Sequence, residues 1–209
     1  MSTLHEMAEA VINGNAKEVR EFAEKALTEG LAPQTIINDG LIAGMNVVGV
    51  RFKNNEVYVP EVLIAARAMH AGMDVIKPLL TDSAVQDKGT VLIGTVKGDL
   101  HDIGKNLVRM MLEGAGYKVI DVGVDVSPEK FAQAVEEYKP QIVGLSALLT
   151  TTMTNMRTTI EALRSYHVRV MIGGAPVTQK FADEIGADAY APDAATAVEK
   201  ANQLLSSSF

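Results

Sequence analysis

Residues 98–104, Gly-Asp-Leu-His-Asp-Ile-Gly, contain the residue types from which a metal-binding histidine is built. Asp99 precedes His101 by two residues, and Gly104 follows it by three. A neutral imidazole can bind a metal through one ring nitrogen while the other donates a hydrogen bond to a carboxylate, which fixes the tautomer and raises the basicity of the ring. The alternative interpretation is that His101 is an ordinary loop residue and that Asp99 caps the next helix.

The position of this motif in the predicted fold favours metal binding. Residues 90–96, Thr-Val-Leu-Ile-Gly-Thr-Val, form an apolar, β-branched run typical of a buried strand, and residues 107–115 have the pattern of a helix. Sheets of parallel strands bind ligands at the loops that leave the carboxyl ends of their strands. We therefore expect a ligand at residues 98–104.

The composition narrows the classes of function. The chain has 209 residues, a net charge of −7 and no cysteine. Its basic residues are scattered, which argues against a nucleic-acid partner because phosphate binding needs clustered Lys and Arg. No apolar run reaches the length of a membrane span, and the N-terminus lacks the pattern of a secretion signal. We expect a cytoplasmic protein with no membrane or nucleic-acid partner, in which His, Asp or Glu holds any metal.

The first part of the sequence predicts a bundle of four helices. Apolar residues recur at helical spacing in residues 2–13, about 15–29, about 33–48 and 60–80, with a loop at 51–58. Helices joined by short loops pack as an antiparallel bundle. A polar stretch at 81–89 then separates two patterns, so we expect a helical-bundle cap domain at 1–82, a linker at 83–89 and an α/β domain at 90–209.

From residue 90 onward, strands alternate with helices. The expected strands are residues 90–96, 118–123, 141–147, 168–172 and 187–191, and the later helices include 152–165, 177–185 and 194–205. Five such units predict a doubly wound, parallel five-stranded sheet in flavodoxin-like (Rossmann-like) order, with helices on both faces. The predicted fold class is thus α/β, with a four-helix bundle before the sheet.

The residues at the strand ends exclude three common uses of such a sheet. A response regulator needs a carboxylate at the end of the third strand, where this chain has Ser146. A flavin mononucleotide loop favours hydroxyls for the phosphate, and here Asp99 and His101 stand in that loop. The dinucleotide fingerprint Gly-x-Gly-x-x-Gly is absent.

Glycines and hydroxyls at the strand ends indicate a bulky ligand. Gly98, Gly123, Gly144 and the pair Gly173-Gly174 lie at or beside the ends of the first four strands. Glycine lets the backbone approach a ligand closely, although strand ends also need it for turns. For Gly173-Gly174 we expect a cleared channel. The third strand is followed by the hydroxyls of residues 150–152, of which Thr151 or Thr152 could cap the next helix.

Three motifs together resemble one known family. They are Asp99-x-His101-x-x-Gly104, Ser146-x-Leu148 and Gly173-Gly174, in this order and spacing. The arrangement is similar to the cobalamin-binding module of methionine synthase and to the corrinoid proteins of methyltransferase systems. The N-terminal half resembles the helical cap domain of these proteins, including Arg51-Phe52 and residues 58–62, Tyr-Val-Pro-Glu-Val. The resemblance covers essentially the whole chain.

The resemblance implies a cofactor and roles for individual residues. The cofactor would be cobalamin (methylcobalamin or another corrinoid), with its benzimidazole tail displaced from cobalt (base-off) and His101 as the lower axial ligand (His-on). Asp99 would accept a hydrogen bond from His101, and Thr152, at a position where methionine synthase has a serine, would extend this relay. Tyr58 would lie on the upper face of the cofactor, which the helical domain covers. The residues implied to contact the cofactor are Gly98, Asp99, His101, Asp102, Ile103, Gly104, Ser146, Leu148, Thr150, Gly173, Gly174 and Tyr58.

The function implied by the resemblance is methyl carriage. Cobalt(I) would take a methyl group from a substrate:corrinoid methyltransferase, and methylcobalt(III) would pass it to a second methyltransferase or acceptor, with the protein orienting and tuning the cofactor. These two enzymes and a corrinoid reductive activase are the implied partners. The methyl donor stays open among methylamines, methanol, methoxyaromatic compounds and betaine. The alternatives are a non-catalytic cobalamin sensor or store, and a cobalamin-dependent mutase subunit, which usually lacks the helical domain.

Overall fold

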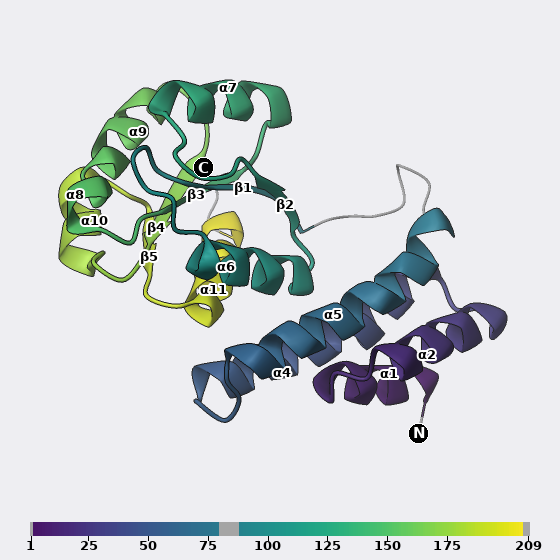
Figure 1. Cartoon of the computed structure of the whole chain (residues 1–209). Coiled ribbons are helices and arrows are strands. Elements are labelled where there is room, and N and C mark those ends of the chain that lie inside the picture. The colour runs from purple at the N-terminus through teal and green to yellow at the C-terminus, as the bar shows by residue number, and fades with distance from the viewer. Residues whose placement is uncertain (1, 80–87, 207–209) are drawn as a thin grey trace. The chain divides into compact units, whose positions relative to one another are not determined.

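The structure, a computed structural model, describes residues 2–79 and 88–206. These residues divide into a helical unit, formed by residues 2–79 together with the short segment 113–116, and an α/β unit formed by the rest (Figure 1). The linker expected at 83–89 lies largely outside the described residues. None of the helices in the described ranges is both long and apolar enough to cross a membrane.

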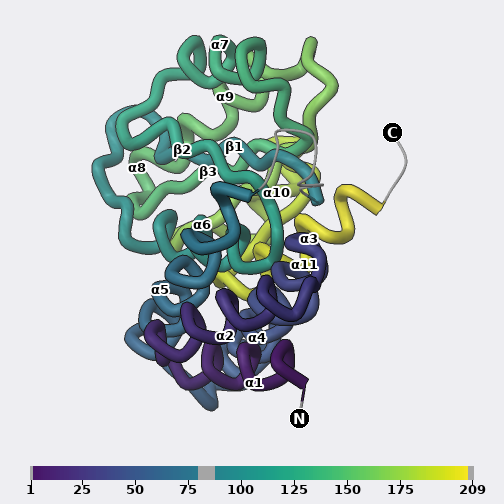
Figure 2. Tube along the Cα trace, turned by 90° about the vertical axis from the view of Figure 1, so that its right-hand side faces the viewer, coloured from purple at the N-terminus to yellow at the C-terminus, as the bar shows by residue number. Residues whose placement is uncertain are grey.

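The helical unit contains the four helices that the sequence predicts, the third of them irregular. Ser2 and Asn15 accept hydrogen bonds from the N–H groups of His5 and Glu18, and so cap the first two helices. Figure 2 shows the long helices of this unit lying alongside one another. The elements are α1 (Thr3–Ile12), α2 (Ala16–Thr28), α3 (Pro33–Thr35), the π-helix η1 (Ile36–Ile42), α4 (Ala43–Lys53), α5 (Val59–Ile76) and the 3-10 turn η2 (Lys77–Leu79).

The third helix differs from the prediction in its interior and at its end. Ile36–Ile42 form a π-helix, with i→i+5 hydrogen bonds, where the sequence predicted a regular α-helix. The helix continues to Lys53, into the segment predicted as a loop. Arg51 and Lys53 lie in its last turn, where positive charge interacts favourably with the helix dipole.

The α/β unit confirms the predicted sheet. All strand pairs are parallel, and their order is β2-β1-β3-β4-β5. The chain moves from β1 to one side and then back past it to β3, so the carboxyl ends of β1 and β3 mark the point where ligands bind in such sheets. The strands are β1 (Thr90–Thr95), β2 (Lys118–Asp121), β3 (Ile142–Ser146), β4 (Arg169–Gly173) and β5 (Ala189–Ala191).

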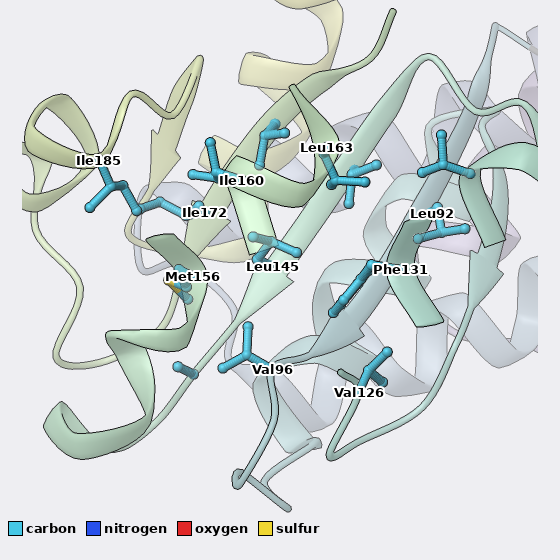
Figure 3. Packing of buried hydrophobic residues seen from close by; sticks show 14 of the residues in the cluster. Leu92, Val96, Val126, Phe131, Leu145, Met156, Ile160, Leu163, Ile172 and Ile185 are labelled. Carbon is cyan, nitrogen blue, oxygen red and sulfur yellow. The ribbon is translucent and has the colours of Figure 1, made fainter. Parts of the chain in front are cut away.

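Helices cover both faces of the sheet (Figure 1). Right-handed crossovers place them so, because the chain first moves from β1 to β2 and then in the opposite direction to β3. One face carries a core to which α7, α9 and α10 contribute, and Figure 3 shows Phe131, Ile160 and Leu163 gathered there with side chains of the strands. These three side chains are at most 5% exposed. The helices are α6 (Ile103–Gly114), α7 (Pro128–Tyr138), α8 (Thr150–Met153), α9 (Asn155–Leu163), α10 (Gln179–Ile185) and α11 (Ala194–Ser206).

Two helix predictions in this unit need correction. The single helix expected at 152–165 is the pair α8 and α9, which meet at Thr154. The helix expected from residue 177 begins at Gln179, because the Thr178 hydroxyl accepts a hydrogen bond from the N–H of Phe181 and caps it there.

Candidate functional site

The loop between β1 and α6 carries the Asp99–His101 pair and is tied to the sheet at several points. The buried Thr95 hydroxyl, in the last residue of β1, donates to the carbonyl of His101 at 2.9 Å. The N–H of Val96 donates to the carbonyl of Ser146 at the end of β3, and the side-chain amide of Asn155 donates to the carbonyl of Lys97 at 2.8 Å. The pair therefore lies at the switch point between β1 and β3.

The Asp99 carboxylate is fully buried and accepts hydrogen bonds on both oxygens. Oδ1 lies 2.7 Å from Nδ1 of His101 and 3.1 Å from its backbone N. Oδ2 accepts from the N–H of Leu148 at 2.8 Å and from the Thr152 hydroxyl at 2.6 Å. A buried carboxylate needs such donors because ionised groups are costly to remove from water.

These hydrogen bonds keep Asp99 ionised. Burial by itself would raise the pKa of this carboxyl, but the hydrogen bonds from Thr152, Leu148 and His101 outweigh burial and hold the pKa well below its ordinary value. An ionised carboxylate can only accept, so Nδ1 of His101 must be the donor of their shared hydrogen bond. The neutral ring then carries its lone pair on Nε2, the nitrogen with which it can bind a metal.

His101 is open to solvent, and exposed apolar side chains lie close to it in the chain and on the segment that donates to Asp99. The His101 side chain is 51% exposed. Leu100 and Ile103 flank it in the chain and are exposed, and so are Leu148 and Leu149, whose N–H groups both donate to Asp99. Of the large apolar side chains exposed in the described part of the α/β unit, all but Tyr138 belong to this group. Apolar groups concentrated at one exposed place mark a binding surface.

Two of the glycines implied to contact the cofactor have backbone conformations that favour glycine. Gly98 has φ of +82°, which favours glycine, and it forms the turn that leads into Asp99. Gly174 has φ of +131°, and a Cβ placed on it would overlap the carbonyl oxygen of Ala147. The backbone of Ala147 thus occupies the place that a side chain at Gly174 would take, and the cleared channel expected at Gly173-Gly174 stays a prediction.

The remaining candidates in the α/β unit lie at the same end of the sheet. Ser146 ends β3 and is half-buried, and Thr150 begins α8 and is exposed. Gly173 ends β4, and a Cβ on it would come within 2.7 Å of the carbonyl oxygen of Ala191. Gly104 lies in the first turn of α6 with open space beside its Cα.

Two candidates have local partners that the sequence did not reveal. Asp102 precedes α6 and accepts a hydrogen bond from the Asn106 side chain at 3.0 Å. Tyr58 belongs to the helical unit, is exposed, and donates its backbone N–H to Glu61 at the start of α5. The roles of both toward a cofactor stay predictions.

The structure also brings in residues that the sequence analysis did not select. Leu149 and Thr95 contact the pair as described above, and Asp125 accepts from the N–H of Gly98 at 2.7 Å. A hydroxyl at the end of an otherwise apolar strand was the available signal for Thr95. The helix-capping role considered for Thr151 or Thr152 is wrong, because no side chain caps α8 and the Thr152 hydroxyl donates to Asp99.

Comparison with known proteins shows which family this chain resembles. A domain family described as B12 binding domain matches residues 89–200, and a second family with the same description matches residues 3–77. Trimethylamine corrinoid protein 2 of Methanosarcina mazei is 48% identical over 191 residues, 88% of each chain. Dimethylamine corrinoid protein 1 of Methanosarcina acetivorans is 46% identical over 207 residues, 97% of each chain.

A solved structure agrees with these matches. A chain of the methanol:cobalamin methyltransferase complex MtaBC from Methanosarcina barkeri superposes with a TM-score of 0.90 and 31% identity, covering 99% of this chain and 80% of that one. The resemblance drawn from the three sequence motifs is thereby confirmed, together with the expected cofactor. The chain belongs to the family of corrinoid proteins with B12-binding domains, and its cofactor is a cobalt-containing corrinoid.

Proposed function

We propose that this protein is a methyl carrier that holds cobalamin in the base-off, His-on form, with Nε2 of His101 as the lower ligand of cobalt. The observation that carries this proposal is the 2.7 Å hydrogen bond between Nδ1 of His101 and a fully buried carboxylate of Asp99. A metal-binding histidine characteristically donates its second ring nitrogen to a carboxylate in this way.

The residues present fit a corrinoid in two respects. The donor is a half-exposed imidazole whose orientation a buried anion fixes, which suits a transition metal that accepts nitrogen ligands. The exposed side chains of Leu100, Ile103, Leu148 and Leu149 around it offer apolar surface to a macrocycle. Packing of a large ring against these side chains would remove them from water.

Three residues of the protein have separate roles in holding the cobalt. When bound, cobalt supplies the centre that accepts and releases the methyl group, which is chemistry that the cofactor brings. Asp99 keeps Nδ1 of His101 protonated and raises the basicity of Nε2. Thr152 holds Asp99 in place and keeps it ionised. Their hydrogen bonds make His101, Asp99 and Thr152 one relay.

The other predicted contacts belong to the same proposal. We expect the displaced tail to lie near Ser146, Thr150 and the Gly173-Gly174 pair, which share the carboxyl end of the sheet with His101. We expect Gly98, Asp102 and Gly104 to shape the loop beneath the ring, and Tyr58 of the helical unit to contact the upper face.

The proposed partners are a substrate-specific methyltransferase, a second methyl-accepting methyltransferase and a reductive activase, all in the cytoplasm. Relatives named trimethylamine and dimethylamine corrinoid proteins are 48% and 46% identical, whereas the relative in the methanol:cobalamin complex is 31% identical. We therefore propose that a methylamine is the primary methyl donor, with methanol as the second candidate.

The test is a methylation assay with the corrinoid-loaded protein. The protein is loaded with hydroxocobalamin, reduced to cobalt(I), and incubated with a di- or trimethylamine methyltransferase and its substrate, or with a methanol methyltransferase and methanol. Methylation with an amine is the expected result. Methylation with methanol alone would correct the donor, and no methylation with any partner would favour a cobalamin sensor or store.

A further inference from the structure

Asp125 has a left-handed backbone conformation, with φ of 53°, in the segment between β2 and α7. Residues other than glycine adopt this conformation at a cost in free energy. The other non-glycine residues with positive φ in the described ranges are Asn55 and Lys139, and each lies within two residues of the end of a helix, where such a conformation is common. Asp125 is not at a helix end, so its conformation needs another explanation.

That explanation is a pair of hydrogen bonds to the loop that carries the cobalt ligand. The backbone N–H of Asp125 donates to the carbonyl of Asp99 at 3.0 Å. Its side-chain Oδ1 accepts from the N–H of Gly98 at 2.7 Å. One residue thus holds both ends of the Gly98–Asp99 dipeptide, and strained conformations persist where surrounding contacts compensate in this way.

Hydrogen bonds of the residues on either side of Asp125 strengthen this attachment. The N–H of Val126 donates to the carbonyl of Thr95 at 3.0 Å, and Val96 and Val126 form an isolated parallel bridge. The N–H of Thr95 in turn donates to the carbonyl of Gly123 at 2.9 Å. Residues 123–126 therefore run beside the end of β1 and place Asp125 against the loop.

The position of the Asp99 backbone decides where its carboxylate lies. That carboxylate accepts from both the ring and the backbone of His101, so a shift of Asp99 moves the imidazole with it. We infer that Asp125 is a positioning residue for the lower cobalt ligand, acting through Gly98 and Asp99. This inference rests on the proposed function and extends it to a residue whose hydrogen bonds reach Gly98 and Asp99.

Variants at Asp125 separate the effect of its side-chain hydrogen bond from the effect of its strained backbone. Asp125→Ala removes the carboxylate and keeps the backbone strain, whereas Asp125→Gly removes the carboxylate and relieves the strain. Asp125→Asn keeps an acceptor oxygen and tolerates positive φ. Because the Asp125 side chain is exposed, none of these changes disturbs the core. Lys139→Gly is the matched control, since it relieves the same kind of strain away from the loop.

Each protein is loaded with hydroxocobalamin, and the pH at which the imidazole leaves cobalt is read from the visible spectrum. We expect the midpoint for Asp125→Ala and for Asp125→Gly to rise by about one pH unit, which corresponds to about tenfold weaker ligation, as for loss of other residues that orient metal ligands. Asp125→Asn and Lys139→Gly should keep the midpoint of the unaltered protein.

The outcomes distinguish this inference from the proposed function. An unchanged midpoint in Asp125→Ala, in protein with an unaltered circular dichroism spectrum, would overturn the positioning role and leave His101 as the ligand. A shift in Asp125→Asn as large as that in Asp125→Ala would also overturn it, because the acceptor is then not what matters. Absence of imidazole ligation in the unaltered protein at any pH would instead overturn the proposed function, and this inference with it.

Discussion

The Thr152 hydroxyl donates a hydrogen bond of 2.6 Å to Oδ2 of Asp99, across 53 residues of sequence. Thr152 lies in α8, after β3, and Asp99 lies in the loop after β1. The two neighbouring strands of the sheet therefore bring a donor and a buried anion together. This contact completes the set of donors around the carboxylate that orients His101.

Removing that hydroxyl should destabilise the protein. Thr152→Val preserves the shape of the side chain but leaves Asp99 with one donor fewer, which is expected to cost about 1 to 3 kcal/mol. Thr152→Ser keeps the hydroxyl and should cost less. Urea unfolding of the cofactor-free protein measures the difference, with Thr151→Val, at an exposed neighbour, as control. Equal stabilities for Thr152→Val and Thr151→Val would show that the hydrogen bond contributes nothing.

Asp99→Asn should be more harmful than its small change in shape suggests. All the groups around the carboxylate are donors, so the amide NH2 of asparagine would face one of them, and we expect a loss of roughly 2 to 3 kcal/mol at pH 7. The folded pKa of Asp99 lies below its ordinary value of 3.8, so its contribution is present above pH 3.8 and is lost as the pH falls further.

The stability gap between the unaltered protein and Asp99→Asn should accordingly narrow as the pH falls from about 4 into stronger acid. Unfolding by urea at a series of pH values measures this gap. A gap that widens as the pH falls below about 4 would contradict the direction of the pKa shift.

The protein is expected to lose stability in alkaline solution because Tyr117 is buried. It is 4% exposed, its hydroxyl donates to Oδ1 of Asn202 at 2.7 Å, and burial raises its pKa to about 12. Between about pH 10 and 12 the unfolded chain loses this proton while the folded chain keeps it, so the free energy of unfolding should fall by roughly 2 to 3 kcal/mol. Tyr117→Phe should lack this component of the pH dependence.

Urea unfolding at pH 8, 10 and 11.5 compares the unaltered protein with Tyr117→Phe. Tyr58→Phe, which alters an exposed tyrosine, serves as control and should follow the unaltered protein. The prediction fails if Tyr117→Phe loses stability as steeply as the unaltered protein over this range.

Gly174→Ala tests the close approach between the ends of β3 and β4. The added methyl group would overlap the carbonyl of Ala147, and the positive φ would add backbone strain, for a cost on the order of 3 kcal/mol. Gly104→Ala, with open space beside it, should be tolerated. Thermal unfolding of the cofactor-free variants measures both, and a stable Gly174→Ala protein would show that the backbone there can move apart.

The sequence predicted the α/β sheet well because its signals are local. Apolar strand runs alternate with amphipathic helices, and handedness rules then leave few arrangements, among them the observed order. The π-helix at Ile36–Ile42 escaped prediction because a regular helical period was assumed. The break at Thr154 escaped it because threonines interrupt a helix without the clear signal of glycine or proline.

The site was predictable only in part. The short spacing of Asp99 and His101 suggested their hydrogen bond, which the structure contains. The partnership of Asp99 with Thr152 came from the resemblance alone, since no local pattern links residues so far apart. The hydrogen bonds of Thr95 and Asp125 to the loop depend on the approach of separate segments, and the sequence offered no spacing that indicates them.

Electron paramagnetic resonance of the cobalt(II) form, in protein carrying ¹⁵N-labelled histidine, tests the central claim most directly. An imidazole nitrogen bound to cobalt splits the spectrum, and replacing ¹⁴N by ¹⁵N must change each triplet into a doublet. We predict this change in the unaltered protein and in His167→Ala, and loss of any splitting that depends on the histidine label in His101→Ala. A splitting in the unaltered protein that does not respond to the histidine label, or a label-dependent splitting that survives in His101→Ala, would contradict the assignment of His101 as the lower ligand.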